Sequence, residues 1–455
     1  MTKAKTSSTA TVQADLGLLG ELVADARRAG ADAADAMLVR GRSLSVELRM
    51  RAPEKTERSE GVDLGLRVFI GKRQASVSSS DLSAPALKQV VERAVAMARA
   101  VPEDEFCGLA PEEALARDWP QLEMEDQKEH AAEKLIDRAR ACEEAALGVA
   151  GVTNSGGAEA SWGRSTVALA ASNGFAGGYG SSRYSVSVSV MAGEGTGMER
   201  DYDFTSTVFD RDLDKAEAVG RSAGERAVRR LKPRKGPTAQ LPVVFDPRVS
   251  NSLLGHLLGA ISGASVARGT SFLKDQLGQR ILPEGVDVID DPHRQRGLRS
   301  RPFDGEGLAT RRMALVEDGV LKTWLLDLRS ARQLKLAPTG HAARDTSGPP
   351  GPSASNVYLA AGRIARDALL AGIDQGFYVN ELMGFGVNGV TGDYSRGASG
   401  FWIEKGQLAY PVSEMTIAGN LKAMFKAITA ADDLVFKYGT NAPTLRVDGM
   451  TIAGA

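Results

Sequence analysis

The segment from residue 241 to residue 261 restricts the fold more than any other part of the sequence. It begins with a short apolar run, Leu241-Pro-Val-Val-Phe245, which predicts a buried strand. Apolar residues then recur at helical spacing and predict a buried helix: Val249, Leu253, Leu254, Leu257, Leu258 and Ile261. His256 lies within this helix. A helical zinc site needs a second ligand about one turn away, so packing is the favoured role for a lone histidine here.

The linker Lys232-Pro-Arg-Lys-Gly-Pro237 marks the main domain boundary. We predict four regions: a disordered tail at 1–14, an N-terminal α+β domain at 15–100, a central α+β domain at 101–235 and a C-terminal domain at 236–455. Period-two strands, such as 181–191, alternate with helices before the linker. Short turns such as Glu317-Asp-Gly319 indicate antiparallel pairings after it. The predicted fold class is therefore α+β and multi-domain, with N-terminal α/β units containing antiparallel strands and a sheet-rich C-terminal domain.

The composition argues against a protein built to coat nucleic acid. Lys plus Arg number 56 and Asp plus Glu number 57, which gives a net charge of −1 rather than a basic excess. A local basic run at 229–235 is interpreted as a solvated helix end that leads into the linker. The two cysteines are far apart and do not form a disulfide framework. No signal peptide and no membrane span of about 20 apolar residues is recognisable. We therefore expect a cytoplasmic protein without membrane association or direct nucleic-acid binding.

The histidines do not form a zinc-binding motif, because no two of them lie within one helical turn. His256, His293 and His341 are still metal-ligand candidates, since they could converge in space with Asp304 or Glu306. His130 is predicted to lie on an acidic, polar helix and is expected to be exposed.

Three further motifs have structural explanations. Gly384-Phe-Gly-Val-Asn-Gly389 fits G-x-G-x-x-G, but a poor helix former follows it, so these glycines are expected to serve turns and bulges and no NAD site is predicted. Cys107 lies among carboxylates, which raise a thiol pKa, and Cys142 is expected to be a small core residue. No G-x-S-x-G motif occurs, although the members of a Ser/His/Asp triad can be distant in sequence.

Asp304 and Glu306 form the main remaining polar cluster, within Arg299-Ser-Arg-Pro-Phe-Asp-Gly-Glu-Gly307. The favoured interpretation is a turn whose carboxylates pair with the nearby arginines. The alternative is a wall of a peptide cleft, where charged groups contact substrate termini. Arg268, Asp304 and Glu306 are the candidate residues for such a cleft.

Several motifs resemble the PmbA (TldE) branch of the TldD/PmbA family, a metallopeptidase-related family formerly called modulators of DNA gyrase. They are Asp246-Pro-Arg-Val-Ser, Gly263-Ala-Ser-Val-Ala-Arg-Gly-Thr-Ser-Phe272, Arg301-Pro-Phe-Asp-Gly-Glu-Gly307, Ser413-Glu-Met-Thr-Ile-Ala-Gly-Asn-Leu421 and Tyr438-Gly-Thr-Asn-Ala-Pro-Thr444. In the TldD branch the helix carries His-Glu-x-x-x-His, with two zinc-binding histidines and a general base. At these positions the present chain has Asn251, Ser252 and His256. The family's third ligand, a cysteine near the C-terminus, has no counterpart here.

The resemblance implies a C-terminal domain of the PmbA/TldD type and a cytoplasmic heterodimer that processes unfolded peptides. A TldD-type chain would hold the zinc, and this chain would be a subunit that binds no cofactor of its own and has no catalytic residues. In the absence of that partner a homodimer is the alternative assembly. Two other functions stay open: a stand-alone metallopeptidase with a divergent metal site, and a regulatory binding protein that acts on DNA gyrase.

Overall fold

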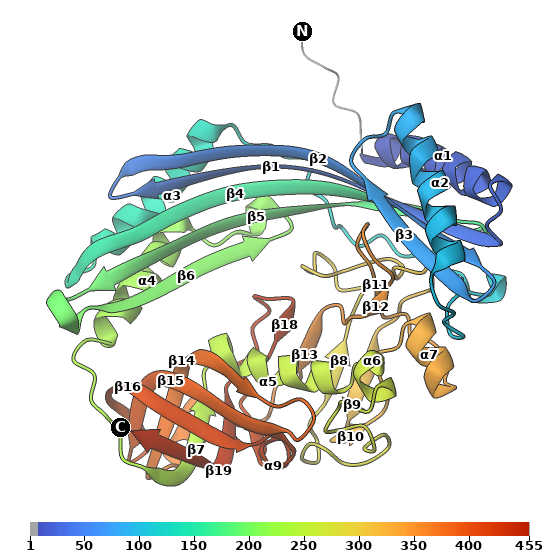
Figure 1. The fold of residues 1–455 in the computed structure, drawn as a ribbon. Coiled ribbons are helices and arrows are strands. Elements are labelled where there is room, and N and C mark those ends of the chain that lie inside the picture. Colours follow the sequence, from blue (N-terminus) through green and yellow to red (C-terminus); the bar gives the residue numbers. More distant parts are fainter. Residues whose placement is uncertain (1–7, 455) are drawn as a thin grey trace.

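The structure, a computed structural model, describes residues 8–454, and its N-terminal half is built on one antiparallel sheet (Figure 1). The strand order is β3-β2-β1-β4-β5-β6. The central pairing of β1 with β4 runs from Asp35 opposite Ala171 to Leu48 opposite Ala158, so one sheet joins strands of the predicted regions 15–100 and 101–235. The strands are β1 (Ala33–Arg49), β2 (Ala52–Ile70), β3 (Arg73–Ser79), β4 (Val152–Ala171), β5 (Ala176–Ala192) and β6 (Glu199–Thr207).

The alternation of side chains along β1 decides what each face of this sheet contacts. Leu38 belongs to a core with α1 and α2 at one end of the sheet, and Leu48 belongs to a core with α3 and α4 at the other end. Met37, on the opposite face, packs with Phe303 of the C-terminal half. The helices therefore cover one face, and the C-terminal half contacts the other. These helices are α1 (Ser8–Arg28), α2 (Ala84–Ala100), α3 (Ala132–Leu147) and α4 (Ala216–Arg229).

The first helix begins earlier than the sequence predicts. Residues 1–7 of the predicted disordered tail lie outside the described residues, but residues 8–14 are helical, so the prediction of disorder is wrong for them. Ser8 is buried against Glu125 and accepts a hydrogen bond from Arg164 Nη2 at 3.2 Å. Val12 is also buried. These contacts hold the first turn of α1 on the sheet, although its Ser/Thr/Ala composition gives no such signal.

The C-terminal half contains a small closed barrel. The sheet order is β16-β15-β14-β7-β19-β17, and an additional pairing of β16 with β19 closes the ring. Closure removes the free edges that an open sheet would leave there. The strands are β7 (Ala239–Phe245), β14 (Gln375–Val387), β15 (Asp393–Glu404), β16 (Gln407–Asn420), β17 (Ile428–Ala430) and β19 (Leu445–Gly454). A mixed α/β architecture with several sheets and a sheet-rich C-terminal domain is thus confirmed.

A second, smaller sheet lies beside the barrel in the order β10-β9-β8-β13-β18. Its strands are β8 (Val288–Asp290), β9 (Met313–Glu317), β10 (Val320–Leu321), β13 (Val357–Leu359) and β18 (Thr440–Asn441), and β11 (Ala342–Ala343) pairs with β12 (Gly351–Pro352) nearby. The remaining helices are α5 (Pro247–Ala260), α6 (Gly263–Ala267), α7 (Leu328–Leu334), α8 (Arg366–Ala371) and α9 (Leu421–Lys426). Within residues 8–454, none of the helices has the length and apolar character needed to cross a membrane.

Helix α5 forms where the sequence predicts it, directly after β7. Asp246 caps its N-terminus by accepting a hydrogen bond from the Arg248 backbone N–H at 2.9 Å, and Pro247 occupies the first turn. The predicted apolar face is buried in the largest core, where residues such as Leu253 and Leu257 meet the barrel strands and β8.

His130 is not exposed, which corrects the sequence prediction. It lies just before α3, its side chain is 9% exposed, and its Nε2 atom lies 2.9 Å from an Asp210 carboxylate oxygen. The Trp162 indole N–H donates to the His130 carbonyl and holds this segment against the sheet. The acidic residues around His130 gave no indication that a carboxylate 80 positions away would pair with it.

We predict that Gly220→Ala destabilises the protein, because α3 and α4 approach each other closely at this residue. A Cβ atom at Gly220 would lie 1.9 Å from the carbonyl oxygen of Cys142. Relieving this overlap should cost about 1–3 kcal/mol of unfolding free energy, measured by urea denaturation.

Gly17→Ala is the matched control, because Gly17 also lies within a helix but a Cβ atom added there would meet no neighbouring element within 4 Å. This change should stabilise the protein by about 0.5–1 kcal/mol. An unfolding midpoint for Gly220→Ala at or above that of the unchanged protein would contradict the close helix approach.

Candidate functional site

Two residues singled out on α5 line a cavity. Asn251 and Ser252 face a space of about 200 Å³ between α5, the edge strand β6 and β14. The Ser252 hydroxyl donates to the Val249 carbonyl oxygen at 2.6 Å, so its proton is already used within the helix. The described residues offer the Asn251 side chain no hydrogen-bond partner, which leaves its amide available to a ligand.

His256, one turn further along α5, has a different environment. Its ring packs edge-on against Tyr394 with 5.8 Å between the ring centroids. The Nε2 atom is buried without a hydrogen-bond partner among the described residues, as is the Tyr394 hydroxyl. Burial lowers the pKa of His256, and the nearby positive charge of Arg396 lowers it further. His256 is therefore held as a neutral, packed imidazole.

The wall of the cavity that faces α5 is an ion-pair network. Asp201 of β6 is 2% exposed, accepts a hydrogen bond from Arg248 Nη1 at 2.8 Å and lies 3.6 Å from Arg230 Nη1. Arg230 Nη2 in turn contacts Glu381 of β14 at 2.5 Å. Burial alone would lower the pKa of Arg248, but the Asp201 carboxylate raises it above the usual range. The network joins β6, the end of α4, α5 and β14, which come from both halves of the chain.

Arg230 departs from the interpretation of the basic run at 229–235 as a solvated helix end, whereas the other cations of the run are exposed, as that interpretation expects. The Arg230 side chain is 11% exposed. Arg234 lies over the Tyr410 ring, with 4.5 Å between the guanidinium carbon and the ring centroid. Lys235 is 3.4 Å from Glu414. These contacts attach the linker to the barrel, because each of the three cations finds an acidic or aromatic partner there.

Asp304 and Glu306 are both buried, at 1% and 9% exposure. Asp304 accepts backbone hydrogen bonds from Glu306, Leu308 and Ala342, and it also lines a cavity of about 100 Å³. Glu306 accepts a hydrogen bond from the Leu328 N–H at 2.8 Å. Burial raises the pKa of both carboxyls, and for Glu306 the neighbouring Asp304 adds to the effect and brings its pKa to about 8.

These two carboxyls lie close to a second ion-pair contact between the halves. Asp35 of β1 accepts hydrogen bonds from Arg67 of β2 and, at 2.6 Å, from Arg344 of the C-terminal half. Burial works to raise the pKa of Asp35, but Arg344 and Arg67 overcome this effect and lower it. Arg268, the third cleft candidate, is exposed at the end of α6. The structure therefore places Arg268 in a different environment from the two buried carboxyls.

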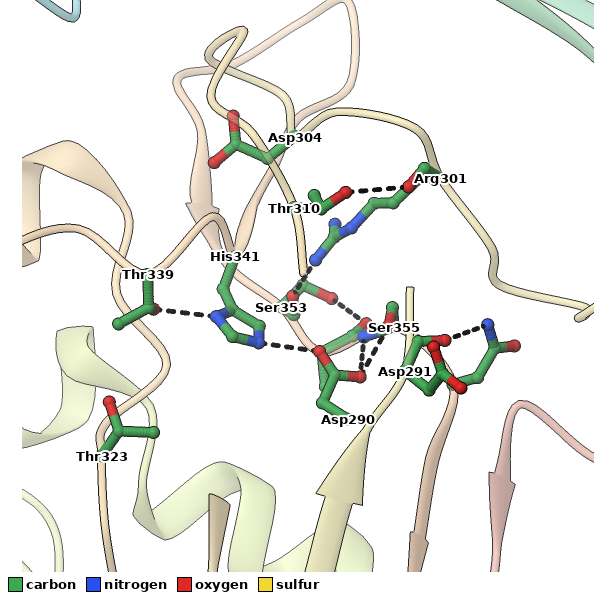
Figure 2. Close-up of polar contacts among 12 residues, drawn as sticks. Asp290, Asp291, Arg301, Asp304, Thr310, Thr323, Thr339, His341, Ser353 and Ser355 are labelled. Atoms are coloured by element: carbon green, nitrogen blue, oxygen red, sulfur yellow. Dashed lines mark hydrogen bonds and ion pairs between the residues drawn. The ribbon is translucent and has the colours of Figure 1, made fainter. Parts of the chain in front are cut away.

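His341 takes part in a buried polar cluster that the sequence did not reveal (Figure 2). Its Nε2 atom lies 2.7 Å from Asp290 Oδ2, and its Nδ1 atom lies 2.8 Å from Thr339 Oγ1. Ser355 donates to Asp290 Oδ1 at 2.6 Å. Burial favours a higher pKa for Asp290, but the hydrogen bonds from His341 and Ser355 lower it. Serine and histidine both bind the aspartate, so the histidine has no serine to deprotonate and the cluster is not a catalytic triad.

The residues present do not fit a zinc site. His293 Nε2 contacts Thr310 Oγ1 at 3.0 Å, and His341 uses both ring nitrogens in the buried cluster. Among residues 8–454, no group of three or more His, Cys, Asp or Glu side chains is arranged to hold a metal ion. His256 thus has one potential ligand nitrogen and no second ligand on α5, since Asn251 and Ser252 offer only a neutral amide and a hydroxyl.

The glycines at 384–389 serve backbone geometry, as predicted. The pairing of β14 with β15 shifts register between Met383 and Gly386, and a Cβ atom at Gly386 would lie 2.4 Å from the Ser395 carbonyl oxygen. A similar bulge at Asn380 places a polar side chain into the wall of the α5 cavity. Burial raises the pKa of both thiols, to about 12 for Cys142, which leaves neither cysteine with a reactive thiolate near neutral pH.

Comparison with family models assigns the three parts of the chain in order. Residues 34–98 match the PmbA/TldA metallopeptidase domain 1, residues 125–231 match the central domain, and residues 238–454 match the C-terminal domain.

Relatives and solved structures agree with this assignment. The chain is 38% identical over 448 residues to the metalloprotease PmbA of Escherichia coli O157:H7, which covers 97% of this chain and 98% of the relative. It is 37% identical to a PmbA homologue of Haemophilus influenzae, with 94% of both chains covered.

A crystal structure of a protein described as a modulator of DNA gyrase, from Bacteroides thetaiotaomicron, superimposes with a TM-score of 0.89 at 28% identity and covers 96% of this chain and 98% of that one. TldE of Thermococcus kodakarensis has the same fold, with a TM-score of 0.87 at 20% identity and coverage of 96% and 100%.

We predict that Glu306 makes the protein less stable as the pH rises from about 4.5 to about 8. The unfolded chain releases this proton near the ordinary glutamate pKa of 4.5, whereas the folded protein retains it to about pH 8. The native state therefore binds more protons in this window, and its unfolding free energy falls by at most about 1.4 kcal/mol per pH unit. Glu306→Gln should remove this slope.

Urea denaturation at several pH values would measure the effect as the difference between the two proteins. Glu105→Gln, which changes an exposed carboxyl, is the control and should leave the slope unchanged. Equal slopes for the unchanged protein and Glu306→Gln would rule out a buried, protonated Glu306.

Proposed function

This chain belongs to the PmbA/TldD metallopeptidase family, and on that premise we propose that it is a non-catalytic subunit of a peptidase complex. In this proposal a TldD-type partner chain holds the zinc, and the present chain helps to enclose extended peptide substrates. In the absence of such a partner, the chain would form a homodimer.

The proposal rests on the side chains that α5 offers as zinc ligands and as general base. Hydrolysis by this type of zinc site needs two ligands and a general base on one helix face. Asn251 is a poor zinc ligand, and Ser252 cannot take a proton from water near neutral pH as a carboxylate does. The Ser252 hydroxyl is also already bonded to the Val249 carbonyl oxygen. His256 alone does not make a catalytic site.

The cavity beside this helix supports a role in peptide binding. It has a volume of about 200 Å³ and combines the apolar Leu382 with polar groups such as Asn251 and Asn380. Most of the lining is polar or charged, and its aliphatic members are Val249 and Leu382, so the cavity offers hydrogen bonds to a peptide backbone. The Asn380 amide oxygen is buried without a hydrogen-bond partner, which is the state expected of a group that a ligand satisfies. An extended peptide could supply the missing N–H donor.

We predict that the purified chain contains almost no zinc. After dialysis against metal-free buffer, elemental analysis should give a zinc-to-protein ratio near zero, because His256 has no second ligand on its helix. A ratio near one would contradict the proposal and favour a stand-alone enzyme with a divergent site. Replacement of His256, His293 and His341 would then identify the ligands.

We also predict that His256→Gln leaves peptide hydrolysis unchanged when the chain is assembled with a TldD-type partner. The substitution keeps a polar side chain of similar size but removes the imidazole. Cleavage of an unfolded peptide should retain its kcat, whereas replacing the zinc-binding histidines of the partner should abolish it. Loss of kcat in the His256→Gln complex, with normal assembly by gel filtration, would give this chain a catalytic role.

A further inference from the structure

A second, smaller cavity adjoins the first at the N-terminal end of α5. Its volume is about 70 Å³, and it shares Arg248 and Asn380 with the cavity of about 200 Å³. Four arginines take part in its lining: Arg226, Arg229, Arg248 and Arg366. A space of this size accommodates a group of only a few heavy atoms.

Two neighbouring aromatic rings hold two of these arginines in place. Tyr378 of β14 and Phe401 of β15 are directly opposite each other in the barrel sheet, so their side chains are adjacent. The guanidinium carbon of Arg366 lies 5.2 Å from the Tyr378 ring centroid, and that of Arg229 lies 5.1 Å from the Phe401 ring centroid. Cation–π contacts at this distance orient a guanidinium group without neutralising its charge.

The other two arginines already have carboxylate partners. Arg248 Nη1 contacts Asp201 at 2.8 Å, and Arg226 Nη1 contacts Asp203 at 3.4 Å. Within residues 8–454, neither Arg229 nor Arg366 forms an ion pair, and the Arg366 Nε atom is buried without a hydrogen-bond acceptor. Arg366 is half-buried and Arg229 is exposed, and neither has a carboxylate of these residues within ion-pair distance.

Asp246 is the acidic residue in the lining, and both of its carboxylate oxygens accept hydrogen bonds from groups other than the arginine side chains. Its Oδ1 atom accepts the Arg248 backbone N–H at 2.9 Å, and its Oδ2 atom accepts the Tyr378 hydroxyl at 2.7 Å. Burial and then the Asp246 charge raise the pKa of Tyr378, so this hydroxyl stays a neutral donor. Asp246 therefore caps α5 and fixes the Tyr378 ring instead of pairing with Arg366.

We propose that the smaller cavity is a subsite for a carboxylate group of a bound peptide, held between Arg229 and Arg366. This inference rests on the proposed peptide-binding function, with the rest of the peptide in the adjoining cavity beside Asn251. Guanidinium groups match a planar carboxylate through paired N–H donors. The carboxylate would satisfy the Arg366 Nε atom and leave Asn380, at the junction of the two cavities, in contact with the peptide backbone.

The test compares one extended peptide in three forms with the full-length chain: a free C-terminal carboxylate, a C-terminal amide, and the amide with an internal glutamate near its end. Fluorescence anisotropy at constant ionic strength measures the dissociation constants. We expect a form with a carboxylate to bind about tenfold or more tightly than the amide, which is the usual strength of a hydrogen bond to a charged group. The preferred form identifies whether the C-terminus or an acidic side chain enters the subsite.

Arg366→Gln and Arg229→Gln should each remove most of this preference, and Arg363→Gln and Arg221→Gln should retain it. Arg363 and Arg221 are matched controls, because they are exposed arginines near the two subsite residues in sequence and form no ion pair within the described part of the chain. Melting temperatures of all variants show whether each one folds.

Different outcomes separate this inference from the proposed function. If all peptide forms bind equally well to the unchanged protein, the subsite is wrong and peptide binding stands. Equal weakening of all forms by Arg366→Gln and Arg229→Gln would also overturn the subsite, because the arginines would then act only on the structure. If no peptide form binds, both the subsite and peptide binding by this chain are refuted. Displacement of the peptide by inorganic phosphate, without any preference for the carboxylate forms, would assign the cavity to another anion.

Discussion

The buried carboxylate of Asp201 holds the two halves of the molecule in register. It lies on β6, the edge strand of the N-terminal sheet, and pairs with Arg248 at the start of α5 and with Arg230 at the end of α4. Removing one member of a buried ion pair leaves an unpaired charge and costs about 3–5 kcal/mol. Both cavities beside α5 include Arg248 in their lining, so their shape depends on this contact. Asp35 and Arg344 form a second buried pair between the halves.

The chemistry of the site depends on which arginines beside α5 have a carboxylate partner and which do not. Around Asp201, Arg248 and Arg230 are paired with carboxylates, and the Asn251 amide remains available for hydrogen bonding. Beside Tyr378 and Phe401, Arg229 and Arg366 rest on aromatic rings without carboxylate partners among the described residues. In the proposed function, the surroundings of α5 bind an extended, partly anionic chain and do not activate water. This distinction underlies the proposed division of labour with a zinc-holding partner.

Sequence reasoning succeeded where a signal lay within a few residues. The strand and helix at 241–261, the turn function of the glycines at 384–389 and the packed state of His256 were predictable from spacing and residue type. It failed where the residue that a side chain contacts is distant in the sequence. His130 was expected to be exposed but pairs with Asp210, and Arg230, one residue of the run interpreted as solvated, reaches Glu381. The cluster of Asp290, His341 and Ser355 gave no local pattern at all.

The sequence by itself determined the family, the mixed α/β architecture and the donor set on α5, because these depend on residue identities at short, fixed spacings. Only the tertiary structure decided that β4 pairs with β1 to make one sheet from two predicted domains, and that the barrel closes through β16 and β19. The tertiary structure also decided which cationic side chains have a carboxylate partner. Arg248 and Asp201 are 47 positions apart and Lys437 and Asp203 are 234 apart, so their pairing requires the folded chain to bring them together. Charge balance at a site is a property of three-dimensional proximity, which local spacing does not encode.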